Sequence, residues 1–183
     1  MNMKTRNNLP MIRFHQFRDD WEETKLGILS RLITKGTTPQ NFVNNGIKFI
    51  KIECFDGDKI DHSKCLFISD ETHTTALKRS ILMEGDVLFA IAGATIGKCN
   101  IVRREILPAN TNQALSIIRL KPIVCREFVY YILTSNIMQR YIIDTISVGA
   151  QPNLNLEQIN NFSFYLPSLP EQQKIASFLT TVD

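Results

Sequence analysis

The chain has 183 residues, of which 44% are apolar and 21% are charged, and its formal net charge is +3 at pH 7. This composition is ordinary for a globular protein with one core, and a second full domain is not expected. So small a basic excess does not by itself indicate a nucleic-acid partner. Because no run of about 18 apolar residues occurs and the N-terminal segment lacks the apolar core of a signal peptide, we expect no membrane span and a cytoplasmic location.

The first third of the chain is expected to be extended segments joined by turns. In IRFHQFRDDWEETKLG, Phe14, Phe17 and Trp21 surround a short acidic run and are expected to pin this N-terminal arm onto the domain, since burial of an aromatic side chain contributes about 1.5–3 kcal/mol. TKGTTPQ predicts a turn, IKFIKIECF an extended segment and DGDK a second turn. The polar stretch from Lys59 to Thr75 is expected to be a long, irregular loop.

The central segment GDVLFAIAGATIGKCNIVRR predicts two strands joined by a glycine-bounded loop. The strands are expected at Val87–Ala92 and Cys99–Val102, with Gly93 and Gly97 shaping the backbone between them. Continuous rather than alternating apolarity indicates burial of both strand faces. TNQALSIIRLK predicts a further strand. Together with the helices that follow, these segments predict a mixed α/β fold with a curved, largely antiparallel or mixed sheet.

After Pro122 the apolar periodicity becomes helical and then slips. Phe128, Val129 and Leu133 share one helical face, but Asn136 would fall on that face if the helix continued. We therefore expect one helix that ends near Thr134 and a second one capped by Ser135 or Asn136. VGAQPNLN is expected to be a loop with Gly149 after the helix end, and FSFYLP a last extended segment.

The C-terminal segment LPSLPEQQKIASFLTTVD predicts an amphipathic helix. Ser168 and Glu171 have capping-box spacing, and Pro170 is tolerated in the first turn, where its missing N–H has no intrahelical partner. Ile175, Leu179 and Val182 recur on one face, which we expect to be exposed and to favour a partner or weak self-association.

No assembled catalytic, metal or cofactor-binding motif is found in the sequence. In GATIGKC the two glycines enclose three residues where a phosphate-binding loop needs four, and Cys99 stands where a Ser or Thr should bind magnesium. His62 and Cys65 form an isolated pair without the two further ligands that a zinc site needs. The four cysteines contain no C-x-x-C spacing, so reduced and mostly buried thiols are expected. This pattern favours a binding role over catalysis.

Four stretches together resemble one protein family along nearly the whole chain. They are IRFHQFRDDWEETKLG, GDVLFAIAGATIGKCNIV, TNQALSIIRLK and GAQPNLNLEQINNFSFYLPSLPEQQKIASFLTTVD. In this order they resemble the target recognition domain of specificity subunits from type I restriction-modification systems. The L-P-x-L-P-E-Q-x-K-I-A-x-F-L pattern near the end is the most specific part of the resemblance.

The resemblance implies a non-catalytic role in reading double-stranded DNA. Such subunits carry two recognition domains, each of which reads one half of a bipartite site, and long helices that bind the methyltransferase subunits; methyltransferase and restriction subunits supply S-adenosylmethionine chemistry and cleavage. It implies a recognition domain over residues 1–167 and, over residues 168–183, the start of a spacer helix that is cut short. We expect either a shortened piece of a longer subunit or a natural half-subunit.

DNA contacts are expected from basic and polar side chains that flank turns, with Arg or Lys suited to guanine and Asn or Gln to adenine. Gln151 and Asn153, in the loop that resembles the family's G-x-Q-P-N loop, are expected to have a structural role rather than to contact DNA. The alternative for each basic residue is a solvated surface cation, and the alternative for the chain is a docking half-subunit that does not read DNA alone. An independent enzyme is disfavoured by the missing motifs. The candidates are Lys78, Arg79, Lys98, Arg103 and Arg104 for phosphates, and Lys64, His73 and Thr74 for a groove.

Overall fold

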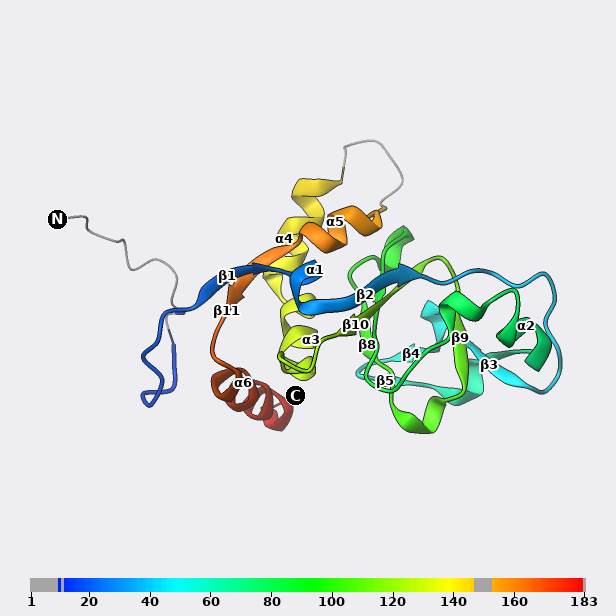
Figure 1. The fold of residues 1–183 in the computed structure, drawn as a ribbon, viewed down its shortest axis with the longest axis horizontal. Helices are drawn as coiled ribbons and strands as arrows, with labels where there is room; N and C mark the ends of the chain where they lie inside the picture. Colours follow the sequence, from blue (N-terminus) through cyan, green and yellow to red (C-terminus); the bar gives the residue numbers. More distant parts are fainter. Residues whose placement is uncertain (1–9, 11, 147–152, 183) are drawn as a thin grey trace.

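A four-stranded antiparallel sheet with the order β2-β10-β7-β8 lies at the centre of the fold (Figure 1). The computed structural model describes residue 10 and residues 12–146 and 153–182. The predicted central strands are confirmed, although each is shorter than expected, and both glycines of the loop between them have positive φ. The sheet consists of β2 (Ser30–Lys35), β7 (Val87–Ala90), β8 (Cys99–Ile101) and β10 (Leu115–Leu120).

Both faces of this sheet are buried, as the continuous apolar pattern predicts. Val87 and Phe89 face one core, which they share with the helices, whereas Leu88 and Ala90 face a second core. The mixed α/β architecture with a largely antiparallel sheet is therefore confirmed. Because layers on both sides exclude water from β7, its residues are apolar throughout and do not alternate with polar ones.

Helices and a small two-stranded sheet cover the first face (Figure 1). The expected break between two helices is confirmed, because Ser135 caps the second one by accepting a hydrogen bond from Ile137 N at 3.2 Å. The sheet pairs the N-terminal arm with the segment before the last helix. This layer contains β1 (Glu22–Lys25), β11 (Ser163–Leu166), α1 (Leu26–Leu29), α3 (Arg126–Thr134), α4 (Asn136–Thr145), α5 (Leu156–Asn161) and α6 (Leu169–Val182).

Short strands and turns cover the second face. A three-stranded mixed sheet with the order β6-β3-β9 lies beside a two-stranded hairpin, β4-β5, that turns at Gly57. These elements are β3 (Ile47–Ile50), β4 (Phe55–Asp56), β5 (Lys59–Ile60), β6 (Leu66–Ile68), β9 (Ala109–Thr111), α2 (Asp70–Thr74) and the 3-10 turns η1 (Ile52–Cys54), η2 (His62–Lys64), η3 (Lys78–Ser80) and η5 (Arg104–Ile106). A further 3-10 turn, η4 (Gly93–Thr95), lies in the loop between β7 and β8.

Two expectations for this region are wrong. IKFIKIECF is not one extended segment, because the strand ends at Ile50 and a 3-10 turn follows. The stretch from Lys59 to Thr75 is not an irregular loop, because β5, η2, β6 and α2 lie within it. Each of these elements has only two to five residues, which is too short for a local periodicity to mark it. β6 in addition becomes a strand by pairing with the distant β3.

The last helix packs onto the domain through its first turns. α6 begins at Leu169 with Pro170 in its first turn, as predicted, and it packs against α3. Gln172 is buried and accepts a hydrogen bond from Cys125 N at 2.9 Å. Ile175 and Leu179 are half-buried rather than exposed, because they line a groove beneath the N-terminal arm. Only Val182 of the predicted apolar stripe is exposed, with 63% of its surface accessible.

The N-terminal arm is held against α6 by an ion pair and by aromatic contacts. Both carboxylate oxygens of Glu171, a side chain that is 1% exposed, accept hydrogen bonds from Arg13 at 2.6 and 2.7 Å. Glu171 therefore anchors the arm instead of completing the expected capping box. Phe14 meets the ring of Phe178 edge-on, and Trp21 meets Phe128 in the same way, which confirms that aromatic residues pin the arm.

Candidate nucleic-acid interface

Four of the sequence-predicted DNA-binding residues come together on α2 and η3. The Ser69 hydroxyl caps α2 by accepting a hydrogen bond from Thr72 N at 3.1 Å, and α2 contacts η3. We call the surface formed by His73, Thr74, Lys78 and Arg79 the α2–η3 edge; it lies at the end of the molecule away from α6 (Figure 1).

Buried Asn110 on β9 holds this edge in place. Its amide donates hydrogen bonds to Leu77 O at 3.0 Å and to the Ser80 hydroxyl at 3.2 Å, and its carbonyl oxygen contacts Nδ1 of His73. His73 is half-buried, and its Nδ1 atom already has a hydrogen-bond partner in Asn110. The Thr74 hydroxyl donates to the Asp70 and Glu71 carbonyls of its own helix. Thr74, Lys78 and Arg79 are exposed, and Lys78 and Arg79 are the charged members of the edge.

The six basic candidates fall into two groups, those that form an ion pair with a carboxylate of the described chain and those that do not. Lys64 on η2 lies 3.3 Å from Asp61, and Arg103 lies 3.2 Å from Asp58, so their charges are compensated at short range. Lys78, Arg79, Lys98 and Arg104 have no carboxylate within ion-pairing distance among the residues that the structure describes. The positive charges of these four side chains are therefore not offset by a described carboxylate and are available to an external partner.

The eight candidates do not form one continuous surface. Lys98 follows Gly97, which lies against Gln139 and Ile142 of α4, so it belongs to the helical side of the molecule. Lys64 belongs to η2, which contacts η1, whereas Arg103 and Arg104 lie near the turn of the β4-β5 hairpin at Gly57 and Asp58. Asn153 forms a β-bridge with Ala92, whereas Gly149 and Gln151 lie outside the described residues.

Sequence reasoning missed three side chains that complete the α2–η3 edge. The Thr37 hydroxyl accepts hydrogen bonds from Nε and Nη2 of Arg79 at 3.2 and 3.1 Å. The neighbouring Thr38 hydroxyl donates to the side-chain oxygen of Gln113. The predicted turn TKGTTPQ was the available signal, but its partners lie 42 and 75 residues away, which no local pattern reveals.

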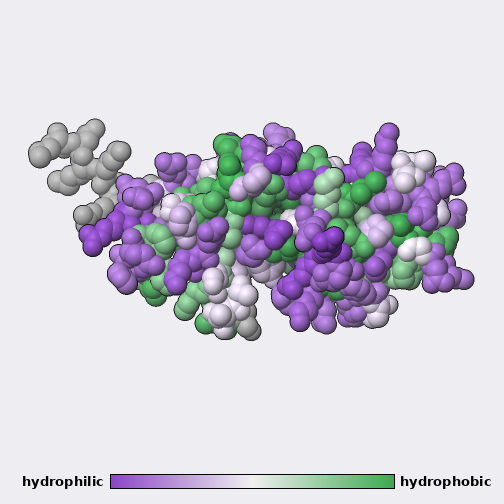
Figure 2. Space-filling model, turned by 60° about the horizontal axis from the view of Figure 1, so that its bottom comes forward, coloured by the Kyte–Doolittle hydropathy of each residue, from purple (hydrophilic) through white to green (hydrophobic). Residues whose placement is uncertain are grey.

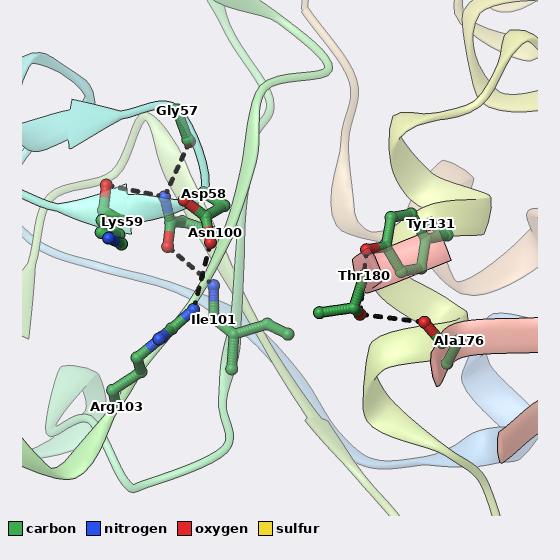
Figure 3. Close-up of polar contacts among 9 residues, drawn as sticks. All are labelled: Gly57, Asp58, Lys59, Asn100, Ile101, Arg103, Tyr131, Ala176 and Thr180. Atoms are coloured by element: carbon green, nitrogen blue, oxygen red, sulfur yellow. Dashed lines mark hydrogen bonds and ion pairs between the residues drawn. The ribbon is translucent and has the colours of Figure 1, made fainter. Parts of the chain in front are cut away.

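A cleft of about 860 Å³ separates the β4-β5 hairpin and η5 from α3 and α6, and its hollow is visible beside α6 in Figure 2. Figure 3 shows its two walls. On one wall Asn100 donates to Gly57 O and Lys59 O, and on the other Tyr131 contacts Thr180 at 3.1 Å. The charged lining consists of Arg103, Arg104 and Arg126 against Asp58, Glu84, Glu105 and Glu127. Such a mixed lining creates no strongly positive potential for a phosphate backbone.

The thiols of Cys54, the last residue of η1, and Cys65, the residue that follows η2, shift each other's pKa. The side-chain hydrogen bond from Cys65 lowers the pKa of Cys54, whereas that hydrogen bond and burial raise the pKa of Cys65. The Cys54 sulfur also accepts a hydrogen bond from Lys51 N at 3.4 Å. Among the described residues, no three His, Cys, Asp or Glu side chains gather as metal ligands would. No described helix is long and apolar enough to cross a membrane.

The family model of the type I restriction modification DNA specificity domain matches residues 18–183. The chain belongs to this family. The specificity domain is 31% identical, over 164 residues, to the type I restriction enzyme EcoBI specificity subunit of Escherichia coli. That match covers 86% of the domain and 34% of the relative, so the chain spans about a third of the length of the curated relative.

Solved structures of low sequence identity share the fold of the specificity domain. The HsdS subunit from Thermoanaerobacter tengcongensis superposes with a TM-score of 0.64 at 21% identity, covering 88% of this chain and 37% of that one. A chain from a structure on complex assembly and conformational transition of the type I R-M system gives a TM-score of 0.65 at 22% identity, with coverage of 93% and 40%. The resemblance inferred from the sequence is thus confirmed.

Proposed function

We propose that this chain recognises one half of a bipartite DNA target for a type I restriction-modification complex. The observation that carries the proposal is the combination of family membership with the α2–η3 edge, where Lys78 and Arg79 are exposed and have no carboxylate partner among the described residues. Cations whose charge is not already compensated release more counterions from DNA when they bind. The edge therefore contributes affinity that the paired Lys64 and Arg103 do not.

Partner chains supply the chemistry in this proposal. Methyltransferase subunits and a restriction subunit act on the DNA, and the specificity domain binds no cofactor and catalyses no step. In this proposal, residues 1–167 form the recognition domain and residues 168–183 begin the spacer helix. The chain lies in the cytoplasm, and it self-associates through Ile175, Leu179 and Val182.

A salt series on labelled duplex DNA of random sequence tests the proposal. Each phosphate contact makes the slope of log affinity against log salt steeper by about 0.9, which is about a 3.5-fold loss of affinity for a fourfold rise in salt. We expect a negative slope for the chain and a slope shallower by about 0.9 for Lys78→Gln. Lys174→Gln, which removes the same charge from the exposed face of α6, should leave the slope unchanged.

A flat salt response would contradict DNA recognition by this chain. It would instead favour the docking half-subunit, which assembles with other subunits without contacting DNA itself. An equal effect of Lys78→Gln and Lys174→Gln would place the phosphate contacts somewhere other than the α2–η3 edge.

A further inference from the structure

The Thr37–Thr38 step is fixed to the central layers of the protein. Thr37 N donates to Thr111 O at 3.1 Å, and Gly36 N donates to Leu115 O at 3.3 Å. A Cβ atom on Gly36 would lie 2.0 Å from Thr111 O, so only glycine allows this close approach. The two threonine hydroxyls therefore sit at fixed positions above the β9–β10 connection.

These two hydroxyls hold two exposed side chains, Arg79 and Gln113, by bonds that leave donors free. Thr37 accepts from Nε and Nη2 of Arg79, so the Nη1 group and the second Nη2 hydrogen have no hydrogen-bond partner among the described residues. Thr38 donates to the side-chain oxygen of Gln113, so the NH₂ group of Gln113 is directed away from Thr38 and can donate to another acceptor. The Thr37–Thr38 step thus presents hydrogen-bond donors, and within the described part of the chain the guanidinium group of Arg79 binds a neutral hydroxyl and no carboxylate.

The base edges of the major groove differ in how well they match a surface of donors. Guanine offers two acceptors, N7 and O6, whereas adenine offers one acceptor and one donor and cytosine offers a donor. The free end of an arginine guanidinium spans the two guanine acceptors. Anchoring by Thr37 also lowers the conformational entropy that Arg79 would lose on binding.

We propose that Arg79, held by Thr37, is a specificity-determining residue that reads a guanine in the major groove, with Gln113 donating to an acceptor beside it. The inference rests on the proposed function and extends it, because it assigns a base preference to one position of the half-site. It also separates two adjacent cations by role, since no described side chain anchors Lys78 in this way and Lys78 contributes charge only.

Selection of bound duplexes from a random-sequence pool, followed by sequencing, tests this assignment. The wild-type chain should enrich guanine at one position, and Arg79→Gln should reduce that preference about 10-fold or more. Lys78→Gln removes the same charge from the adjacent residue and should weaken binding evenly across sequences, leaving the base profile intact. Thr37→Val removes the anchor without changing the charge and should weaken the same guanine preference.

Each failure has a distinct meaning. A wild-type pool with no enriched base would contradict the proposed function itself. A wild-type profile that Arg79→Gln leaves unchanged, or that contains no guanine, would overturn the assignment of Arg79 while leaving DNA recognition in place. Circular dichroism of each folded variant shows that the comparison concerns binding rather than unfolding.

Discussion

Removal of the Asp86 carboxylate is expected to destabilise the domain strongly, because this buried side chain satisfies three donors. Arg119 binds it through Nε and Nη2, both at 2.8 Å, and Met83 N donates to it at 2.8 Å. Asp86 is 0% exposed and Arg119 is 23% exposed. Truncation of one partner of a buried pair costs about 3–5 kcal/mol, so Asp86→Ala should cost about 4 kcal/mol of the about 5–15 kcal/mol that stabilise a typical domain.

Urea unfolding followed by circular dichroism measures this cost. With a denaturant slope of about 2 kcal/mol per molar, Asp86→Ala should lower the midpoint by about 2 M. The control is Asp58→Ala, since the Asp58–Arg103 pair has a similar distance of 3.2 Å but side chains that are 62% and 52% exposed. That change should cost at most about 1 kcal/mol. Equal midpoint shifts for the two variants would refute the reasoning from burial.

Two further predictions concern close packing and the thiol pair. Gly36→Ala should destabilise the domain by about 3 kcal/mol or more, because the new Cβ would collide with Thr111 O. Gly57→Ala should cost about 1 kcal/mol, because φ at Gly57 is +59 and, beyond its chain neighbours, no described atom lies within 4 Å of the new Cβ. Thermal unfolding ranks the two variants, and the reverse order would contradict this packing. The hydrogen bond from Cys65 lowers the pKa of Cys54, so the absorbance of the Cys54 thiolate should develop at lower pH than that of an ordinary cysteine. In Cys65→Ala this titration should move to higher pH. An identical titration of the two proteins would contradict the contact between the thiols.

Local patterns predicted the elements whose own residues carry the signal. The continuous apolar run of β7 and the slip of helical periodicity before Ser135 both lie within one segment of chain. β1 has no such signal, because EETK is mostly polar and exposed, and it becomes a strand only by pairing with β11. α1 also escapes detection, since Gly27 weakens its helical pattern and is needed where Asn160 approaches closely.

The candidate site was predictable in part for the same reason. Lys78 and Arg79 are adjacent cations beside a turn, which the sequence displays directly. Whether a cation stays available depends on partners brought in by the fold: Asp58 lies 45 residues before Arg103. The Lys64–Asp61 pair, three residues apart, is the one compensated case among these candidates that spacing alone could have suggested.

The layering of the fold separates the two kinds of contact that the proposed function requires. The α2–η3 edge belongs to the layer on one face of the central sheet, and the exposed end of α6, with Phe178 and Val182, belongs to the layer on the other (Figure 1). A sheet buried on both faces joins these layers through close-packed side chains, which resist relative movement. Under the proposed function, DNA bound at the α2–η3 edge would therefore be held in a fixed orientation relative to α6, as a half-site reader needs if partner subunits are to act at a defined distance from the bases.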